Sequence, residues 1–121
     1  MSEISDISIK QAVAARALYD AIWIDRNAAK MSEILDDFPK LLNAVIDEDW
    51  KATALHCAAG KGLTEAVQDL LQRKGVEIDK RNKIGCTALY YGCFSGHVDV
   101  VKVLLEHKAN TNIARTVCPV L

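Results

Sequence analysis

The sequence has few of the features that mark membrane, secreted or nucleic-acid-binding proteins. It contains no apolar run of the roughly 18 residues that a membrane-spanning helix needs. Its first residues, MSEISDISIK, carry acidic groups where a signal peptide carries basic ones. The 15 basic and 16 acidic residues leave a net charge of −1, which gives no general attraction to nucleic acid or to an anionic membrane. These absences predict a cytoplasmic protein, with access to the nucleus, that does not bind nucleic acid.

Motifs for catalysis and metal binding are also missing. The sequence holds no G-x-S-x-G element and no glycine-rich phosphate loop, and none of its four cysteines stands in a C-x-x-C pair. Ser95-Gly96-His97 are adjacent residues of a turn, which cannot supply a base and oxyanion donors in the required geometry. The acidic clusters at residues 36–37 and 47–49 lack the ligand spacing of a calcium loop, so we interpret them as solvated turns. We predict reduced thiols, no metal, no cofactor and no enzymatic activity.

What the sequence does contain is an internal repeat. The segment TALHCAAGKG at residues 53–62 returns as TALYYGCFSG at residues 87–96, an offset of 34 residues. Leu70-Leu71 recurs as Leu104-Leu105 at the same offset. A period of this length predicts an array of stacked helical units.

The repeated unit resembles the ankyrin repeat. Its marks are a Thr-x-Leu-His start at Thr53, a glycine eight or nine residues later, a double leucine, and a polar turn residue, Asp79 and then Asn112. The resemblance implies an all-α solenoid of helix-turn-helix units with short hairpin-like fingers. It also implies that His56 and His97 form hydrogen bonds between turns, which we favour over a catalytic or metal-binding role for either residue.

We interpret residues 1–121 as a single ankyrin-repeat domain. Residues 48–79 and 80–112 are the two clear repeats, residues 17–47 resemble a degenerate capping repeat, and residues 113–121 form a partial finger or a C-terminal tail. Degeneracy is expected of a terminal unit, because its outer face meets water and not another repeat.

The capping repeat departs from the pattern in specific places. Its inner turn, Asp25-Arg26-Asn27, lacks the glycine of the other two units, whereas Pro39 falls harmlessly in the loop after the outer helix. Asn43 matches Asp79. The spacing of three apolar residues predicts a helix over residues 4–16 that either extends the first inner helix or lies against it. These residues are Ile9, Val13 and Ala17.

Within the clear repeats the pattern predicts particular contacts. Thr53 and Thr87 begin the inner helices, where a hydroxyl can satisfy free N–H groups. Lys51 stands where the second finger has Gly85, so the first finger is expected to be irregular. The apolar stripe of the second outer helix is Val100, Val101, Leu104 and Leu105. The small residues that let neighbouring inner helices approach are Ala58, Ala59, Gly92 and Cys93.

The aromatic residues fall where the ankyrin pattern directs side chains into the concave groove. Tyr91 and Phe94 occupy such positions in the second repeat, Trp23 or Ile24 is the equivalent in the cap, and Trp50 projects from the first finger. Aromatic clusters of this kind concentrate binding energy. For Trp23 and Phe94, partial burial between helices is an alternative. In the first repeat the groove positions are Cys57, Gly60 and Lys61.

These observations predict a monomeric, non-enzymatic adaptor or inhibitor that binds another protein. The second finger adds a small basic cluster, which is either a partner contact or simply a solvated loop. The predicted partner-binding residues are Trp23, Trp50, Lys61, Arg81, Lys83, Tyr91 and Phe94.

The last four residues, Cys118-Pro119-Val120-Leu121, match the C-a-a-X prenylation pattern. Prenylation of Cys118 would tether the same adaptor to a membrane, and we predict membrane association only in that case. Two other interpretations compete with this one. The segment is the truncated start of a third repeat, or the match is accidental, since Pro119 is not the usual aliphatic residue.

Overall fold

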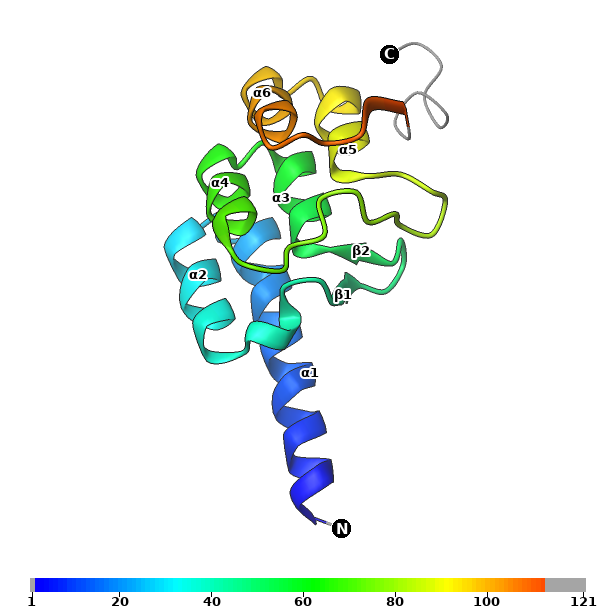
Figure 1. Cartoon of the computed structure of the whole chain (residues 1–121). Helices are drawn as coiled ribbons and strands as arrows, with labels where there is room; N and C mark the ends of the chain where they lie inside the picture. Colours follow the sequence, from blue (N-terminus) through cyan, green and yellow to red (C-terminus); the bar gives the residue numbers. More distant parts are fainter. Residues whose placement is uncertain (1, 113–121) are drawn as a thin grey trace.

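The chain folds as a stack of three helix pairs. The structure is a computed structural model; it describes the backbone of residues 2–112 and the side chains from residue 9 onward. The inner helices α1, α3 and α5 form one layer and the outer helices α2, α4 and α6 form the other (Figure 1), which confirms the predicted all-α solenoid. The helices are α1 (Ser2–Trp23), α2 (Ala28–Asp37), α3 (Ala54–Lys61), α4 (Thr64–Gln72), α5 (Ala88–Phe94) and α6 (Val98–Glu106).

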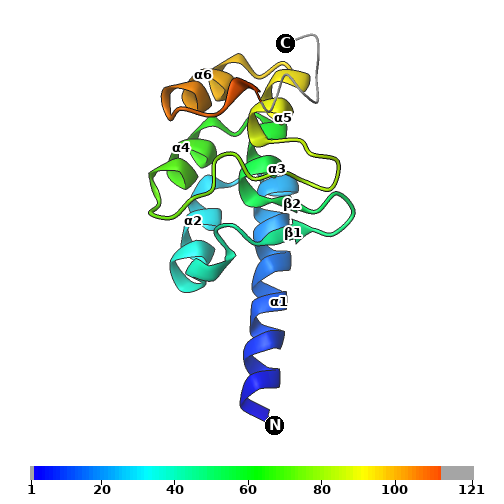
Figure 2. The same ribbon diagram turned by 45° about the vertical axis from the view of Figure 1, so that its right-hand side comes forward.

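Two fingers project from the inner-helix side of the stack (Figures 1 and 2). The first is a short antiparallel hairpin of β1 (Val45–Asp47) and β2 (Ala52–Thr53), whose register shifts between Val45 and Asp47, so the predicted irregularity is present. The second, residues 79–87, lies beside it, and the N–H of Lys83 donates to the carbonyl of Trp50 at 2.8 Å. This bond holds the two finger tips together.

The first inner helix is much longer than the other two. It continues through residues 4–16 and protrudes beyond the stack (Figure 2), so these residues extend the helix and do not fold back against it. Its packed face is Ala14, Leu18, Ala21 and Ile22, all buried. The stripe that predicted the helix is not that face: Ile9 is 60% exposed and Val13 is 64% exposed, because they lie on a different side of the helix from the packed residues.

The outer helices bury apolar residues against the inner layer. Leu35, Leu70 and Leu104 are each almost fully buried, one in each outer helix. The stripe predicted for α6 needs one correction, because Val103 is buried and Leu105 is 45% exposed. In the preceding repeat the counterpart of Leu105 is Leu71, which is buried; α6 packs against α4 there, whereas no further unit within the described residues follows α6.

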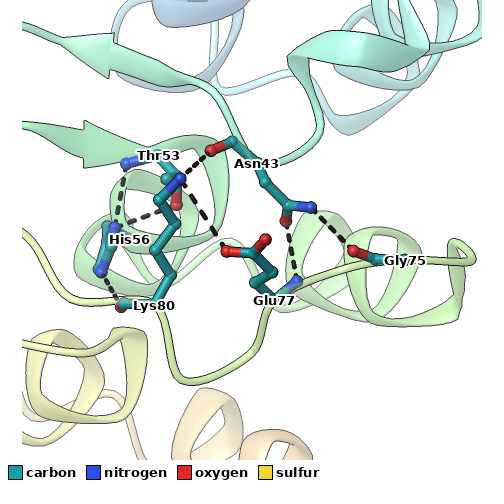
Figure 3. A network of polar contacts seen from close by, with 6 residues as sticks. All are labelled: Asn43, Thr53, His56, Gly75, Glu77 and Lys80. Atoms are coloured by element: carbon teal, nitrogen blue, oxygen red, sulfur yellow. Dashed lines mark hydrogen bonds and ion pairs between the residues drawn. The ribbon is translucent and has the colours of Figure 1, made fainter.

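Polar side chains join each unit to the next at the turns between them. The carboxamide of Asn43 accepts from the N–H of Glu77 and donates to the carbonyl of Gly75, both at 2.8 Å (Figure 3). One unit later, the carboxylate of Asp79 accepts from the N–H of Asn110 at 2.8 Å. The predicted correspondence between Asn43 and Asp79 is therefore confirmed as a shared structural role.

His56 connects the first clear repeat to the second finger. The N–H of Thr53 donates to its Nδ1 at 3.0 Å, so the other ring nitrogen carries the proton and donates to the carbonyl of Lys80 at 2.8 Å (Figure 3). The same nitrogen also donates to the carbonyl of Cys86 at 3.1 Å. Thr53 and Thr87 are the N-caps of α3 and α5, as predicted. The imidazole is 1% exposed, so its role in this structure is the predicted bond between turns.

His97 has the corresponding role between α3 and α5. Its Nε2 lies 3.1 Å from the carbonyl of Gly60. A Cβ added to Gly62 would come within 2.7 Å of the His97 ring, and Gly62 has a φ of 72°. The turn therefore requires glycine both for its backbone conformation and for the space that the imidazole occupies.

The small residues of the inner helices serve two different contacts. A Cβ on Gly60 would lie 3.1 Å from the Tyr91 ring of the next repeat. A Cβ on Gly92, by contrast, would meet Val100 at 3.2 Å and Val101 at 3.3 Å, within the same repeat. The expectation that Gly92 admits a neighbouring inner helix is thus wrong, because its bare side faces its own outer helix, α6.

Cationic residues occupy three backbone positions that usually favour glycine. Arg26, with a φ of 51°, takes the inner-turn position that Gly62 and Gly96 take in the clear repeats. Lys51, at 53°, corresponds to Gly85 in the second finger. Side chains in this left-handed region cost roughly 1–2 kcal/mol per residue. Lys108 adopts the same conformation after α6.

We expect Arg26→Gly to raise the free energy of unfolding by about 1 kcal/mol, because glycine relieves the left-handed strain. The gain is reduced by loss of the 3.2 Å bond from the Arg26 guanidinium to the carbonyl of Lys61. Urea denaturation measures the change. Arg26→Ala is the matched control, since it also removes that bond but keeps a Cβ. A glycine variant less stable than the alanine variant would show that the turn is not strained.

Candidate functional site

A pocket opens between the inner helices and the two fingers. Its volume is about 450 Å³, which lies within the range of roughly 300–1,000 Å³ found for ligand pockets. We call it the groove pocket. It is lined by Tyr19, Trp23, Asp47, Asp49, Trp50, Ala52, Cys57, Asn82, Ile84, Cys86, Tyr90, Tyr91, Phe94 and Ser95.

Two aromatic pairs form opposite walls of the groove pocket. On α1, Tyr19 and Trp23 lie one helical turn apart with ring centroids separated by 5.9 Å. On α5, Tyr90 and Phe94 have the same spacing in sequence, and their rings are stacked at 5.8 Å. The helix between them, α3, contributes only Cys57 to the lining. The hollow exists because large rings on the flanking helices stand on either side of a small side chain.

The fingers supply the outer rim. Trp50 from the first finger is 52% exposed and Ile84 from the second is 58% exposed. Asp47 and Asp49 precede Trp50 on the same finger, and the Asp49 N–H donates to the Asp47 carboxylate at 3.1 Å. The rim therefore combines exposed apolar surface with two acidic groups.

Tyr91 belongs partly to the pocket and partly to the stack. Its hydroxyl accepts from the side-chain amide of Asn82 at 2.7 Å, and its ring centroid lies 5.1 Å from that of His56. Asn82 also caps the second finger by accepting from the N–H of Cys86 at 2.8 Å. Removal of the Tyr91 ring is therefore expected to weaken the repeat interface as well as the groove.

The structure brings together four of the seven predicted partner-binding residues. Trp23, Trp50, Tyr91 and Phe94 all line the groove pocket. Phe94 is 76% exposed, so its alternative burial between helices is wrong, whereas Trp23 is half-buried and packs against the core.

The three predicted basic residues lie outside the pocket lining. The Lys61 ammonium sits 4.7 Å from the centre of the Trp23 ring, at the edge of the groove. Arg81 and Lys83 are exposed on the second finger and do not line the pocket. Their part in binding stays a prediction. Cys57, which was expected to project into the groove, is completely buried and forms its floor.

Sequence reasoning missed Tyr19, Tyr90 and the two carboxylates of the first finger. A usable signal was present for the tyrosines, since each precedes a predicted groove aromatic by four residues and so shares its helix face. Asp47 and Asp49 gave no comparable signal. Their position depends on the irregular register of the hairpin, which brings the first finger beside the groove.

The pocket environment shifts the pKa of several lining groups. Burial, followed by the nearby Asp47 carboxylate, raises the pKa of Tyr19. Burial also raises the pKa of Tyr91, with a smaller contribution from Asp47. The Cys57 thiol has its pKa raised to about 12 by burial, only partly opposed by the nearby Trp23 indole. Cys57 is therefore a neutral thiol at physiological pH and a poor nucleophile.

Other candidate sites take no part in this pocket. Asp36, in the first acidic cluster, pairs with the Arg73 guanidinium at 3.0 Å and so ties α2 to α4. Within residues 2–112 no group of three or more potential metal ligands is gathered. Over the same part of the chain, no helix has the length and apolarity to cross a membrane. Cys118 lies outside the described residues, so its prenylation stays a prediction.

Comparison with known proteins gives a family model that covers most of the chain. The model for ankyrin repeats, in three copies, matches residues 26–115. That range includes the degenerate first unit from its inner turn onward.

Individual relatives share the repeats with this chain but are much larger proteins. The BCL-6 corepressor-like protein 1 of Homo sapiens is 32% identical over 74 residues, which are 61% of this chain and 4% of that protein. Serine/threonine-protein kinase 12 of Arabidopsis thaliana is 33% identical over 84 residues, 66% of this chain and 18% of the kinase. Inversin of Danio rerio is 42% identical over 55 residues, 45% of this chain and 5% of inversin. The chain thus spans less than a fifth of each.

Proposed function

Because this chain belongs to the ankyrin-repeat family, whose members generally act as protein–protein interaction modules, we propose that it is a non-enzymatic adaptor or inhibitor that binds a partner protein in its concave groove. The observation that carries the proposal is the groove pocket, where four aromatic side chains predicted to bind meet in one cavity of about 450 Å³. Solenoids commonly use their concave surface for binding. We propose that the protein acts in the cytoplasm.

Exposure within the pocket supports binding by Trp50 and Phe94 in particular. These side chains are 52% and 76% exposed, so much of their apolar surface stays in contact with water. Apolar rings held at the surface by rigid elements are suited to become anchors when a partner excludes water from them. The outer face carries charged side chains instead of apolar rings, since Asp99, Lys102 and Glu106 of α6 are all exposed.

The relatives do not extend the proposal to catalysis. The match to the Arabidopsis kinase covers 18% of that protein, and ankyrin-repeat domains are typically non-catalytic parts of such enzymes. Likewise, the pKa of Cys57 argues against a reactive thiol in the pocket. We therefore propose that the protein binds its partner and does not catalyse a reaction.

Replacing Trp50 and Phe94 by alanine is the direct test. Each change should weaken capture of a partner from cell lysate by about 2 kcal/mol or more, close to thirtyfold, if the residue is an anchor. Thermal melting should change little, because both rings are largely exposed. Capture is measured by quantitative mass spectrometry of bound proteins against the unaltered chain.

The matched control is a pair of charge reversals on the outer face, Asp99→Lys and Lys102→Glu. These variants should retain the captured proteins. Loss of capture in the outer-face variants, with full capture by Trp50→Ala and Phe94→Ala, would place the binding surface on α6 and refute the groove proposal. Tyr91 is a less suitable probe, since it also packs on His56.

A further inference from the structure

The groove pocket contains carboxylates but no basic side chain. Its lining includes Asp47 and Asp49, and none of the lining residues is lysine, arginine or histidine. Neither carboxylate forms an ion pair among the residues that the structure describes, whereas the neighbouring Glu48 pairs with Lys51 at 2.7 Å. The pocket wall therefore carries two carboxylates that form no ion pair among the described residues, and the nearby cation Arg16 lines the adjacent cavity instead of the groove pocket.

The aromatic rings add to this negative character. The face of an aromatic ring attracts cations, most strongly for tryptophan. Two rings of the pocket already hold cations of the same chain: the Lys61 ammonium lies 4.7 Å from the centre of Trp23, and the Arg16 guanidinium lies 5.3 Å from the centre of Tyr19. Both cations lie outside the pocket lining, so these contacts show that Tyr19 and Trp23 each accept a cation from the edge of the pocket.

We propose that the groove pocket receives a lysine or arginine side chain from an extended segment of the partner protein. The cation lies among the aromatic rings, and Asp47 and Asp49 compensate its charge from the first finger. The proposal rests on the proposed protein-binding function and specifies the chemistry of the partner. An acidic or phosphorylated anchor is disfavoured, because it would approach two carboxylates in a cavity without a basic group in its wall.

The two tryptophans of the chain both line the groove pocket, so their indole N–H resonances report on this pocket. The probes are three acetylated and amidated pentapeptides with four alanines and a central lysine, arginine or norleucine, titrated into the 121-residue chain. Norleucine keeps the aliphatic stem and lacks the charge. We expect the lysine or arginine peptide to bind on the order of tenfold tighter than the norleucine peptide at low salt. Added salt should reduce this preference.

The double variant Asp47→Asn and Asp49→Asn tests the carboxylates with little change in shape. It should lower the affinity for the basic peptide on the order of tenfold and leave the norleucine peptide unaffected. The matched control, Asp37→Asn with Glu106→Gln, removes the same charge from exposed positions on the outer helices and should bind as the unaltered chain does. Lys61→Gln frees the Trp23 ring and should raise the affinity roughly twofold.

Three results would overturn the proposal: equal or tighter binding of the norleucine peptide, unchanged binding by the Asp47→Asn and Asp49→Asn variant, or no indole shift with basic peptide on the order of tens of millimolar. If Trp50→Ala and Phe94→Ala still abolish partner capture, the proposed binding in the groove stands. Only the proposal that the pocket receives a basic side chain of the partner is then refuted. If outer-face variants control capture, the proposed function itself fails.

Discussion

A chain that begins at residue 43 will show no cooperative thermal transition. The missing segment carries α1 and α2, which bury Leu18, Ile22, Met31 and Leu35 against the first clear repeat. Each such side chain contributes roughly 1.5–3 kcal/mol when fully buried, and the total stability of a domain is only about 5–15 kcal/mol. Removing the segment also exposes the apolar face of α3 and α4, which a repeat unit cannot bury by itself. Circular dichroism during heating measures the transition.

The control for this truncation is a chain that begins at Lys10. It removes the tip of the protruding part of α1, where Ile9 is 60% exposed, and should melt within a few degrees of the 121-residue chain. A cooperative melt of the shorter chain, 43–121, near the original midpoint would mean that α1 and α2 are an appendage and not a structural cap.

His56→Ala should lower the free energy of unfolding by roughly 3 kcal/mol or more, because it leaves buried polar groups without partners. The imidazole is 1% exposed and connects Thr53 to the carbonyls of Lys80 and Cys86. It is the principal polar link between α3 and the second finger. Urea denaturation at pH 7.5 provides the measurement.

The same residue should make stability depend on pH. Burial lowers the pKa of His56, although the two carbonyl acceptors act in the opposite direction. A histidine with a folded-state pKa below its unfolded value near 6.5 contributes full stability above about that pH. The contribution falls as the pH drops from about 6.5 towards the folded-state pKa, since the buried ring must then take up a charge. We expect unfolding free energy to decrease from pH 7.5 to pH 5.5.

His107→Ala is the matched control for both experiments. His107 is exposed at the C-terminus of α6, where its Nδ1 lies 2.9 Å from the carbonyl of Val103. His107→Ala should lower the free energy of unfolding by no more than about 1 kcal/mol. This variant should still lose stability at low pH. That loss should largely disappear in His56→Ala. If the pH profile of His56→Ala is unchanged, the loss of stability at low pH arises from other titratable groups.

Much of the stack was predictable because repeats are specified by local patterns. The 34-residue offset located α3 to α6, and the Thr-x-Leu-His start placed both His56 and the N-cap Thr53. Asn43 was aligned with Asp79 without any coordinates, and both accept a backbone N–H from the next unit. Such predictions succeed when a residue's contact is set by its position within one repeat.

Contacts that depend on a neighbouring unit were harder to predict. Leu105 follows the same pattern as Leu71, yet it is 45% exposed, whereas Leu71 is buried in α4, the helix against which α6 packs. Sequence similarity assigns both to an apolar stripe, but burial requires a neighbour. For the same reason Ile9 and Val13 gave the correct helix and the wrong packed face.

The sequence by itself determined the repeat, and its resemblance to the ankyrin pattern determined the helical solenoid and four aromatic residues of the groove, because each depends on a position within one unit. Only the tertiary structure decided that Tyr19 and Tyr90 join those four, and that Asp47 and Asp49 face the same cavity. The physical reason is that the groove pocket is shared by three inner helices and two fingers. Its composition depends on how the units curve together and on the register of one hairpin, and neither is encoded in the pattern of a single repeat.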